Sequence, residues 1–216
     1  MNATIEQFVT ELRKNPDVLG ILLFGSRARG NNRDDSDVDL LVIVEHGFHR
    51  IVDERANLAF EIIFTTEDQA ISFWRANPDD TAELWKTAKI LFDRNGTMQR
   101  LQNVGAEILS QGKAPLQAEQ LAHIRFDIGD QVKAIEAFAY SDPVTARLLL
   151  SAKMLCLTEL YFDIRQLWTP PPKQRLAVIK EIDSRFFDLI AKYYETPSLS
   201  MQIDAFKSIL AIVLEQ

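Results

Sequence analysis

The stretch from Phe24 to Leu40 constrains the fold of this chain more strongly than any other part of it. The stretch reads F-G-S-R-A-R-G-N-N-R-D-D-S-D-V-D-L, and apolar residues run into it and out of it. Short apolar runs that end at a glycine or in a polar loop are typical of buried strands. We therefore expect strands at residues 18–24 and 36–44, joined by a short helix after Gly25 and a polar loop.

Two carboxylates lie near the start of the second of these strands. Asp37 and Asp39 are two residues apart, so their side chains leave the same face of a strand. Carboxylates this close repel each other unless a cation lies between them, and oxygen ligands favour Mg²⁺ or Mn²⁺. Gly25 lets the backbone approach a ligand closely, and Ser26 begins a helix whose N–H groups suit a phosphate. A phosphate cradle beside a dicarboxylate indicates phosphoryl or nucleotidyl transfer.

The two parts of this stretch together resemble a known family. Gly25–Gly30 (G-S-R-A-R-G) and Ser36–Leu40 (S-D-V-D-L) are similar to the signature of the nucleotidyltransferase superfamily of the DNA polymerase β type. Small bacterial members carry both strings almost letter for letter. The resemblance covers residues 15–100. It implies an α+β fold, with an N-terminal polymerase β-like domain whose mixed sheet is flanked by helices.

A third acidic residue stands in the next apolar run, which we expect to form a strand. Glu61 is the one charged residue in L-A-F-E-I-I-F at residues 58–64, and a carboxylate in a core strand is costly unless a cation or hydrogen bonds compensate. The resemblance implies that a third acid completes the catalytic and metal site of Asp37 and Asp39, and Glu61 is the matching position. Family members often have Asp there. The longer Glu leaves open whether it binds metal, acts as the general base, or does both.

The resemblance also implies the substrate and the cofactor. It implies two Mg²⁺ ions, or Mn²⁺ in their place, and a nucleoside triphosphate, ATP or another, whose phosphates lie at the start of the short helix. Arg27 or Arg29 would offset the charge that develops during transfer. The candidate nucleotide-binding residues are Gly25, Ser26, Arg29 and Ser36.

The remaining elements of the first half follow from spacing and from helix breakers. The H-G-F-H string at residues 46–49 is expected to be a turn or the start of a short helix that ends near Asn57. Its two histidines read as ordinary surface residues, because no Cys or further His accompanies them. We also expect helices at 4–14, 66–75, 81–87 and 98–111, and a strand at 89–93.

The sequence changes character at Gly112–Pro115, where Gly and Pro occur together in a small, polar segment. We place the domain boundary there, with a catalytic domain at residues 1–112 and a helical bundle at residues 115–216 that we expect to bind the substrate or a partner. In the second part, apolar residues recur at intervals of three and four, as in amphipathic helices. Four antiparallel helices are predicted, at residues 116–140, from Pro143 to 167, from the proline run to 195, and at 199–214.

Composition limits the cellular setting. The 216 residues contain one cysteine, Cys156, which excludes an internal disulfide and sits in an apolar helical string where we expect a buried thiol. No apolar run approaches the ~20 residues that span a bilayer, and the N-terminus lacks a signal-peptide pattern. We therefore expect a cytoplasmic protein that does not contact a membrane.

The balance of basic and acidic side chains limits the class of acceptor that the protein can bind. Residues 1–110 carry 12 basic and 18 acidic side chains, and residues 111–216 carry 12 and 13. Neither half has the basic excess that a polynucleotide demands, so a small molecule or a protein is the expected acceptor. An acidic body also suits cationic acceptors such as aminoglycosides.

Three functions remain open at this point. The first is transfer of a nucleoside monophosphate, AMP from ATP by expectation, to a hydroxyl of a small molecule such as an antibiotic. Helical C-terminal domains of antibiotic nucleotidyltransferases line the substrate cleft, which makes Asp127 and Asp130 candidates on the acceptor side. The second is adenylylation of a protein partner, as by antitoxins of the minimal nucleotidyltransferase type. The third is a non-catalytic nucleotide-binding module.

Overall fold

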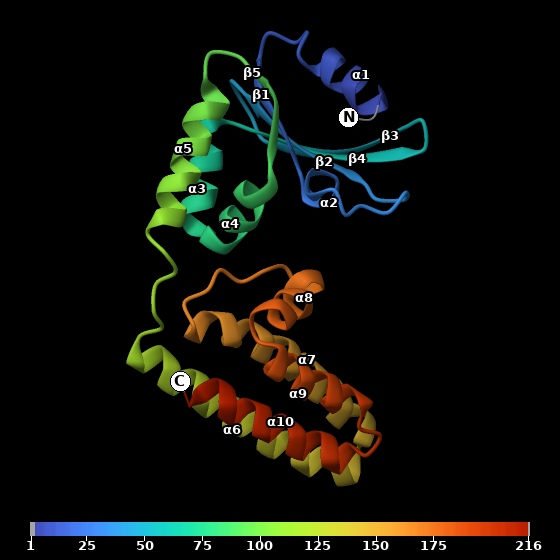
Figure 1. The fold of residues 1–216 in the computed structure, drawn as a ribbon, viewed down its shortest axis with the longest axis vertical. Coiled ribbons are helices and arrows are strands. Elements are labelled where there is room, and N and C mark those ends of the chain that lie inside the picture. Colours follow the sequence, from blue (N-terminus) through green and yellow to red (C-terminus); the bar gives the residue numbers. More distant parts are fainter. Residues whose placement is uncertain (1–2, 216) are drawn as a thin grey trace. The chain divides into compact units, whose positions relative to one another are not determined.

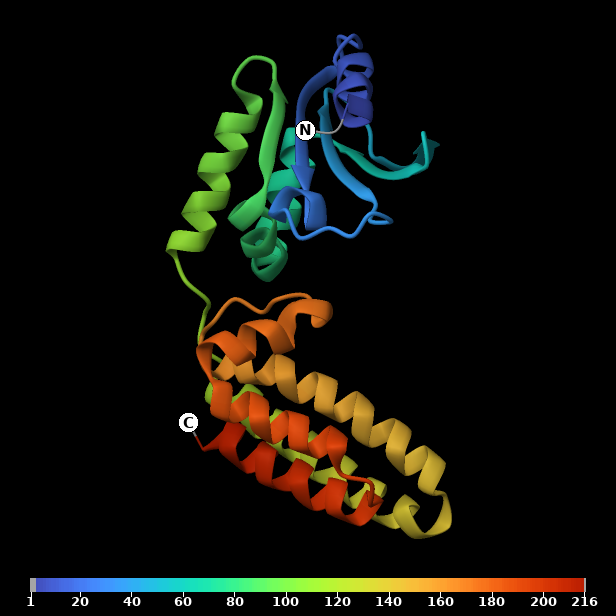
Figure 2. The same ribbon diagram turned by 45° about the vertical axis from the view of Figure 1, so that its right-hand side comes forward.

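The computed structural model describes residues 3–215, which divide into two compact units that meet between Gln111 and Gly112. Figures 1 and 2 show a first unit that combines a sheet with helices and a second unit built from helices. The elements of the first unit are α1 (Ala3–Leu12), β1 (Val18–Phe24), α2 (Gly25–Arg29), β2 (Val38–Val44), β3 (His49–Arg55), β4 (Leu58–Thr65), α3 (Glu67–Ala76), α4 (Pro78–Thr87), β5 (Lys89–Asp93) and α5 (Thr97–Ser110).

The five strands form one mixed sheet in the order β3-β4-β2-β1-β5. β2 and β4 pair in parallel, and the other neighbours pair antiparallel. Helix α1 covers one face through Phe8, which packs with Phe60 of β4. Helices α3 and α5 cover the other face, where Trp74 and Met98 are buried with Leu41 of β2 (Figure 1). The predicted α+β class with a helix-flanked mixed sheet is confirmed.

One segment of the first unit differs from the sequence-based prediction. Residues 46–57 do not form a short helix, because β3 is an edge strand that makes a hairpin with β4. Ala56 and Asn57 connect the two strands with φ of 49° and 64°. Two consecutive positive φ angles are the signature of a type I′ hairpin turn, which usually contains Asn-Gly or Asp-Gly. Ala-Asn is a weak form of this signal, which explains the wrong prediction.

The second unit contains five helices within residues 112–215: α6 (Ala118–Ser141), α7 (Pro143–Ile164), α8 (Pro172–Ile182), α9 (Ser184–Glu195) and α10 (Leu199–Leu214). The predicted third helix is thus two helices. Asp183 separates them, because its carboxylate accepts a hydrogen bond from the N–H of Phe186 at 3.0 Å and so begins α9 as an N-cap. The bundle core is aliphatic and aromatic, with Tyr161 stacked on Phe186 at 4.4 Å between ring centres.

Helix α7 is apolar on its exposed side as well as on its buried side. Leu148 and Leu155 are exposed while Leu150 and Leu157 are buried. Cys156 follows Leu155 and is exposed too, so the expectation of a buried thiol is wrong. The apolar neighbours of Cys156 in sequence did not reveal which side of the helix it occupies. Across residues 3–215, no helix combines the length and the apolar character needed to span a membrane.

Candidate active site

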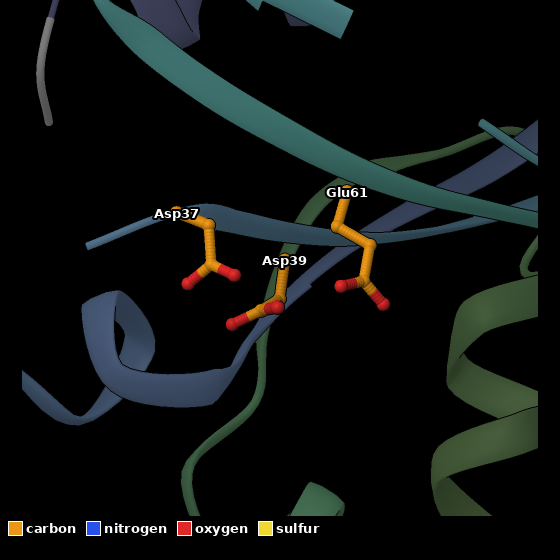
Figure 3. Close-up of side chains that lie close together, drawn as sticks. All are labelled: Asp37, Asp39 and Glu61. Carbon is orange, nitrogen blue, oxygen red and sulfur yellow. The ribbon is translucent and has the colours of Figure 1, made fainter. Parts of the chain in front are cut away.

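Three acidic side chains converge at one end of the sheet. Asp39 of β2 and Glu61 of β4 are register partners across the parallel pair, and Asp37 directly precedes β2. Each of the three offers a carboxylate oxygen, and these oxygens lie within 4.8 Å of one another. Figure 3 shows the three side chains projecting on the same side of the sheet. The structure therefore brings together the three residues that the sequence nominated as the catalytic and metal site.

Gly25 adjoins this cluster because its neighbour Phe24 pairs with Asp39 across β1 and β2. Gly25 has φ of 71°, a left-handed conformation that favours glycine. A Cβ added to Gly25 would lie 2.7 Å from the Cγ of Asp39, which is far inside van der Waals contact. The space beside Gly25 is therefore occupied by the side chain of Asp39, whereas the sequence-based interpretation assigned the close approach at Gly25 to a ligand. Ser26 follows at a half-buried position.

Arg27 holds the loop that carries Asp37. Its Nε donates to the carbonyl oxygens of Ser36 and Asp37, both at 3.0 Å, and its Nη2 donates to Ser36 at 2.6 Å and Asp34 at 3.4 Å. A planar guanidinium can serve several carbonyls at once because its N–H groups are fixed in a fork. Sequence reasoning treated Arg27 as a charge for the transition state and did not detect this role. These contacts could not be predicted because they join residues of an irregular polar loop, in which residue spacing does not indicate which groups lie close together.

Arg29 and Ser36, both nominated for nucleotide binding, have partners within the chain. The Nη1 of Arg29 lies 2.8 Å from a carboxylate oxygen of Glu83 in α4, and both side chains are largely buried. The Ser36 hydroxyl accepts a hydrogen bond from the N–H of Arg33 at 2.9 Å. The guanidinium of Arg33 pairs with Asp35 at 2.9 Å and lowers the pKa of that carboxyl.

Arg50 of β3 was not nominated by the sequence, yet it contacts the acidic cluster. Its Nη2 donates to Oε1 of Glu61, and the two side chains form an ion pair. The residue was missed because β3 was not recognised as a strand. Side chains alternate in direction along a strand, so a strand at residues 50–55 joined to the next by a two-residue turn would have placed Arg50 on the same face as Glu61.

The donor set fits a hard divalent cation. All three ligand groups are carboxylates, which suit Mg²⁺ and Mn²⁺ better than softer metals. Among residues 3–215, the cluster is the one group of three or more His, Cys, Asp or Glu side chains close enough to share an ion. Asp127 and Asp130 lie on α6 of the helical unit and are both exposed. They belong to no such group.

Comparisons with known proteins agree on the first unit. Residues 6–97 match the family model described as polymerase beta, nucleotidyltransferase. The crystal structure of a nucleotidyltransferase-like protein from Exiguobacterium sibiricum 255-15 is similar, with a TM-score of 0.53 at 15% sequence identity. The similarity covers 98% of this chain and 74% of that protein. At such low identity the likeness shows the fold alone. None of the curated protein sequences matches this chain.

Proposed function

We propose that the protein, whose residues 6–97 match the polymerase beta, nucleotidyltransferase family model, moves a nucleoside monophosphate to an acceptor hydroxyl and releases pyrophosphate. The proposed donor is ATP, and the proposed acceptor is a small molecule, with a cationic antibiotic as the first class to test. The observation that carries the proposal is the convergence of Asp37, Asp39 and Glu61 beside Gly25.

In this proposal the three carboxylates hold Mg²⁺ or Mn²⁺. Divalent ions in such sites lower the pKa of an attacking hydroxyl and neutralise the leaving group. The β- and γ-phosphates lie at Gly25 and Ser26, next to Asp39. The acceptor oxygen forms a bond to the α-phosphorus, and the bond from that phosphorus to pyrophosphate breaks. Glu61 accepts the proton of the acceptor hydroxyl at a carboxylate oxygen, as the general base of the reaction.

The arginines near the cluster have separate tasks in this scheme. Arg27 keeps Asp37 in place through the backbone, and Arg29 is paired with Glu83. An arginine that contacts phosphate would have to leave these partners, so we assign the phosphates to the backbone at Gly25 and Ser26 first. Asp127 and Asp130 remain candidates for the acceptor side, and their role depends on the acceptor.

The experiment that tests the proposal has two parts. Calorimetric titration of the full chain with ATP and MgCl₂ measures nucleotide binding. Incubation with γ-labelled ATP and a panel of aminoglycosides, lincosamides and protein fractions then reports release of labelled pyrophosphate, and mass spectrometry detects an added AMP. Release that requires a small-molecule acceptor supports the proposal. Modification of a protein instead would favour the antitoxin-like alternative, and binding without release would favour the non-catalytic module.

A further inference from the structure

Arg50 occupies a defined place beside the acidic cluster. In the β3–β4 hairpin, Val52 lies opposite Glu61 and Arg50 lies opposite Ile63. Residues two apart on a strand share a face, so Arg50, Val52 and Glu61 are on the same side of the sheet. From there the guanidinium of Arg50 reaches diagonally to Oε1 of Glu61. Diagonal neighbours on paired strands are within reach of long side chains.

We propose that Arg50 is a built-in counter-ion of Glu61 that competes with the divalent metal ion for this carboxylate and thereby weakens metal binding. The inference rests on the proposed function, because it takes the three acids to be the metal site. Arg50 is a positioning residue in this view, since it acts on the ion through Glu61.

The solvent exposure of the Arg50–Glu61 ion pair indicates whether Arg50 competes with the metal ion or holds Glu61 rigidly in place. The Arg50 side chain is 60% exposed and that of Glu61 is 25% exposed. Exposed ion pairs are weak and are screened by salt, so this contact can yield to a divalent ion. A guanidinium and a metal ion on one carboxylate also repel each other over a short distance. Arg27, in contrast, is engaged by backbone carbonyls and presents no such competition.

The test measures Mn²⁺ affinity directly, by calorimetric titration of the full-length protein at low salt without nucleotide. Arg50→Gln should tighten Mn²⁺ binding by about two- to fivefold, the range expected for one exposed ion pair. The difference should shrink as salt is added, because screening weakens the competing contact. Arg50→Lys keeps the charge and should stay near the wild-type affinity.

Two matched variants control for charge and for folding. Arg33→Gln removes an exposed arginine that pairs with Asp35, and it should leave Mn²⁺ affinity unchanged. Glu61→Gln removes the shared carboxylate, so adding Arg50→Gln to it should change Mn²⁺ affinity by less than Arg50→Gln does alone, and the difference is the coupling that a double-mutant cycle measures. Melting temperatures near the wild-type value would show that the variants are folded.

Weaker or unchanged Mn²⁺ binding in Arg50→Gln would overturn the inference. Weaker binding would mean that Arg50 orients Glu61 as a supporting partner. The proposed function fails separately: Mn²⁺ binding that is missing from the wild type, or that Asp37→Asn leaves unchanged, would remove the acidic cluster as the metal site and the inference with it.

Discussion

Each unit of the protein contains an arginine that ties a loop to its core, and the two arginines differ in what the loop carries. In the helical unit, Arg175 is 7% exposed and donates to the carbonyl of Pro170 at 2.9 Å. It also pairs with Glu159 of α7 at 3.1 Å. In the first unit, Arg27 donates to the carbonyls of residues 34, 36 and 37. The loop held by Arg175 is proline-rich and joins two helices. The loop held by Arg27 carries Asp37, a carboxylate of the acidic cluster.

The arginine contact by itself is a structural device, and its consequence depends on the side chains that the attached loop carries. Removing the contact at Arg175 should affect stability, and removing it at Arg27 should affect the geometry of the site. The first unit therefore gathers its acidic cluster at one end of a sheet. The second unit is built around an aromatic and aliphatic core.

The largest expected effect is at the cluster itself. Asp37→Asn should reduce pyrophosphate release by at least about 10³-fold, because even one neutral transition-state donor is worth ~10²–10³. Thermal unfolding should be unchanged, since Asp37 is exposed. A stopped-time assay for pyrophosphate checks the rate, and a melting curve checks the fold. Activity close to that of the wild type would contradict the assignment of the metal site to the acidic cluster of the first unit.

The next largest effect is in the bundle. Phe206 of α10 is buried in its core, and Phe206→Ala should lower the free energy of unfolding by about 3–5 kcal/mol. The control is Phe126→Ala, because Phe126 is 74% exposed and its loss should stay within about 0.5 kcal/mol. Urea unfolding measures both. A loss of Mn²⁺ affinity in folded Phe206→Ala protein would contradict the assignment of the metal site to residues of the first unit alone.

The two arginines give a smaller and sharper test. Lysine keeps the charge but loses the planar fork. Arg27→Lys should therefore weaken Mn²⁺ binding by about 10–100-fold, as for other groups that orient metal ligands. Arg175→Lys should lower the free energy of unfolding by about 1–3 kcal/mol, because buried carbonyls lose their donor. Equal changes in Mn²⁺ affinity for both variants would contradict the conclusion that only Arg27 positions a group of the acidic cluster.

The smallest expected effect is a pH dependence of the bundle. Burial raises the pKa of Tyr193 to about 12. The unfolded chain loses this proton near its ordinary pKa of 10.0, so between these values the unfolded state binds fewer protons and stability falls as pH rises. Tyr193→Phe should reduce the fall, whereas Tyr140→Phe, at a position 94% exposed, should not. Urea unfolding below and within this pH window measures the difference.

Much of the sheet could be predicted because its signals are local. The Gly-Ser corner and the alternation of Asp37, Val38 and Asp39 placed two carboxylates on one strand face, and the apolar surroundings of Glu61 marked the third. The nature of the arginine contacts could not be predicted. Arg27 bonds to carbonyls in a loop without periodicity, and the partner of Arg50 depends on a hairpin whose Ala-Asn turn is atypical.

The helical unit was predicted less well for a related reason. Residues 172–195 have helical spacing throughout, so the break at Asp183 is visible only through its capping bond to Phe186. Helix α7 is apolar around most of its circumference, so sequence could not tell which side is buried, and Cys156 was placed on the wrong one. Periodicity identifies a face only when one side of a helix is polar.

The parallel pairing of β2 with β4 bears on the order in which the protein is made and folded. β4 fills the sheet between β2 and β3, so β3 has no neighbour until the ribosome has produced residues 58–65. A nascent chain that stops earlier already carries both aspartates but not the strand that brings Glu61 and Arg50 to them. Pairing strands that are distant in sequence also costs loop-closure entropy before the contacts stabilise the sheet. The cluster is thus complete only after β4 has paired with β2, and a nascent chain that ends before Glu61 lacks one of the three carboxylates.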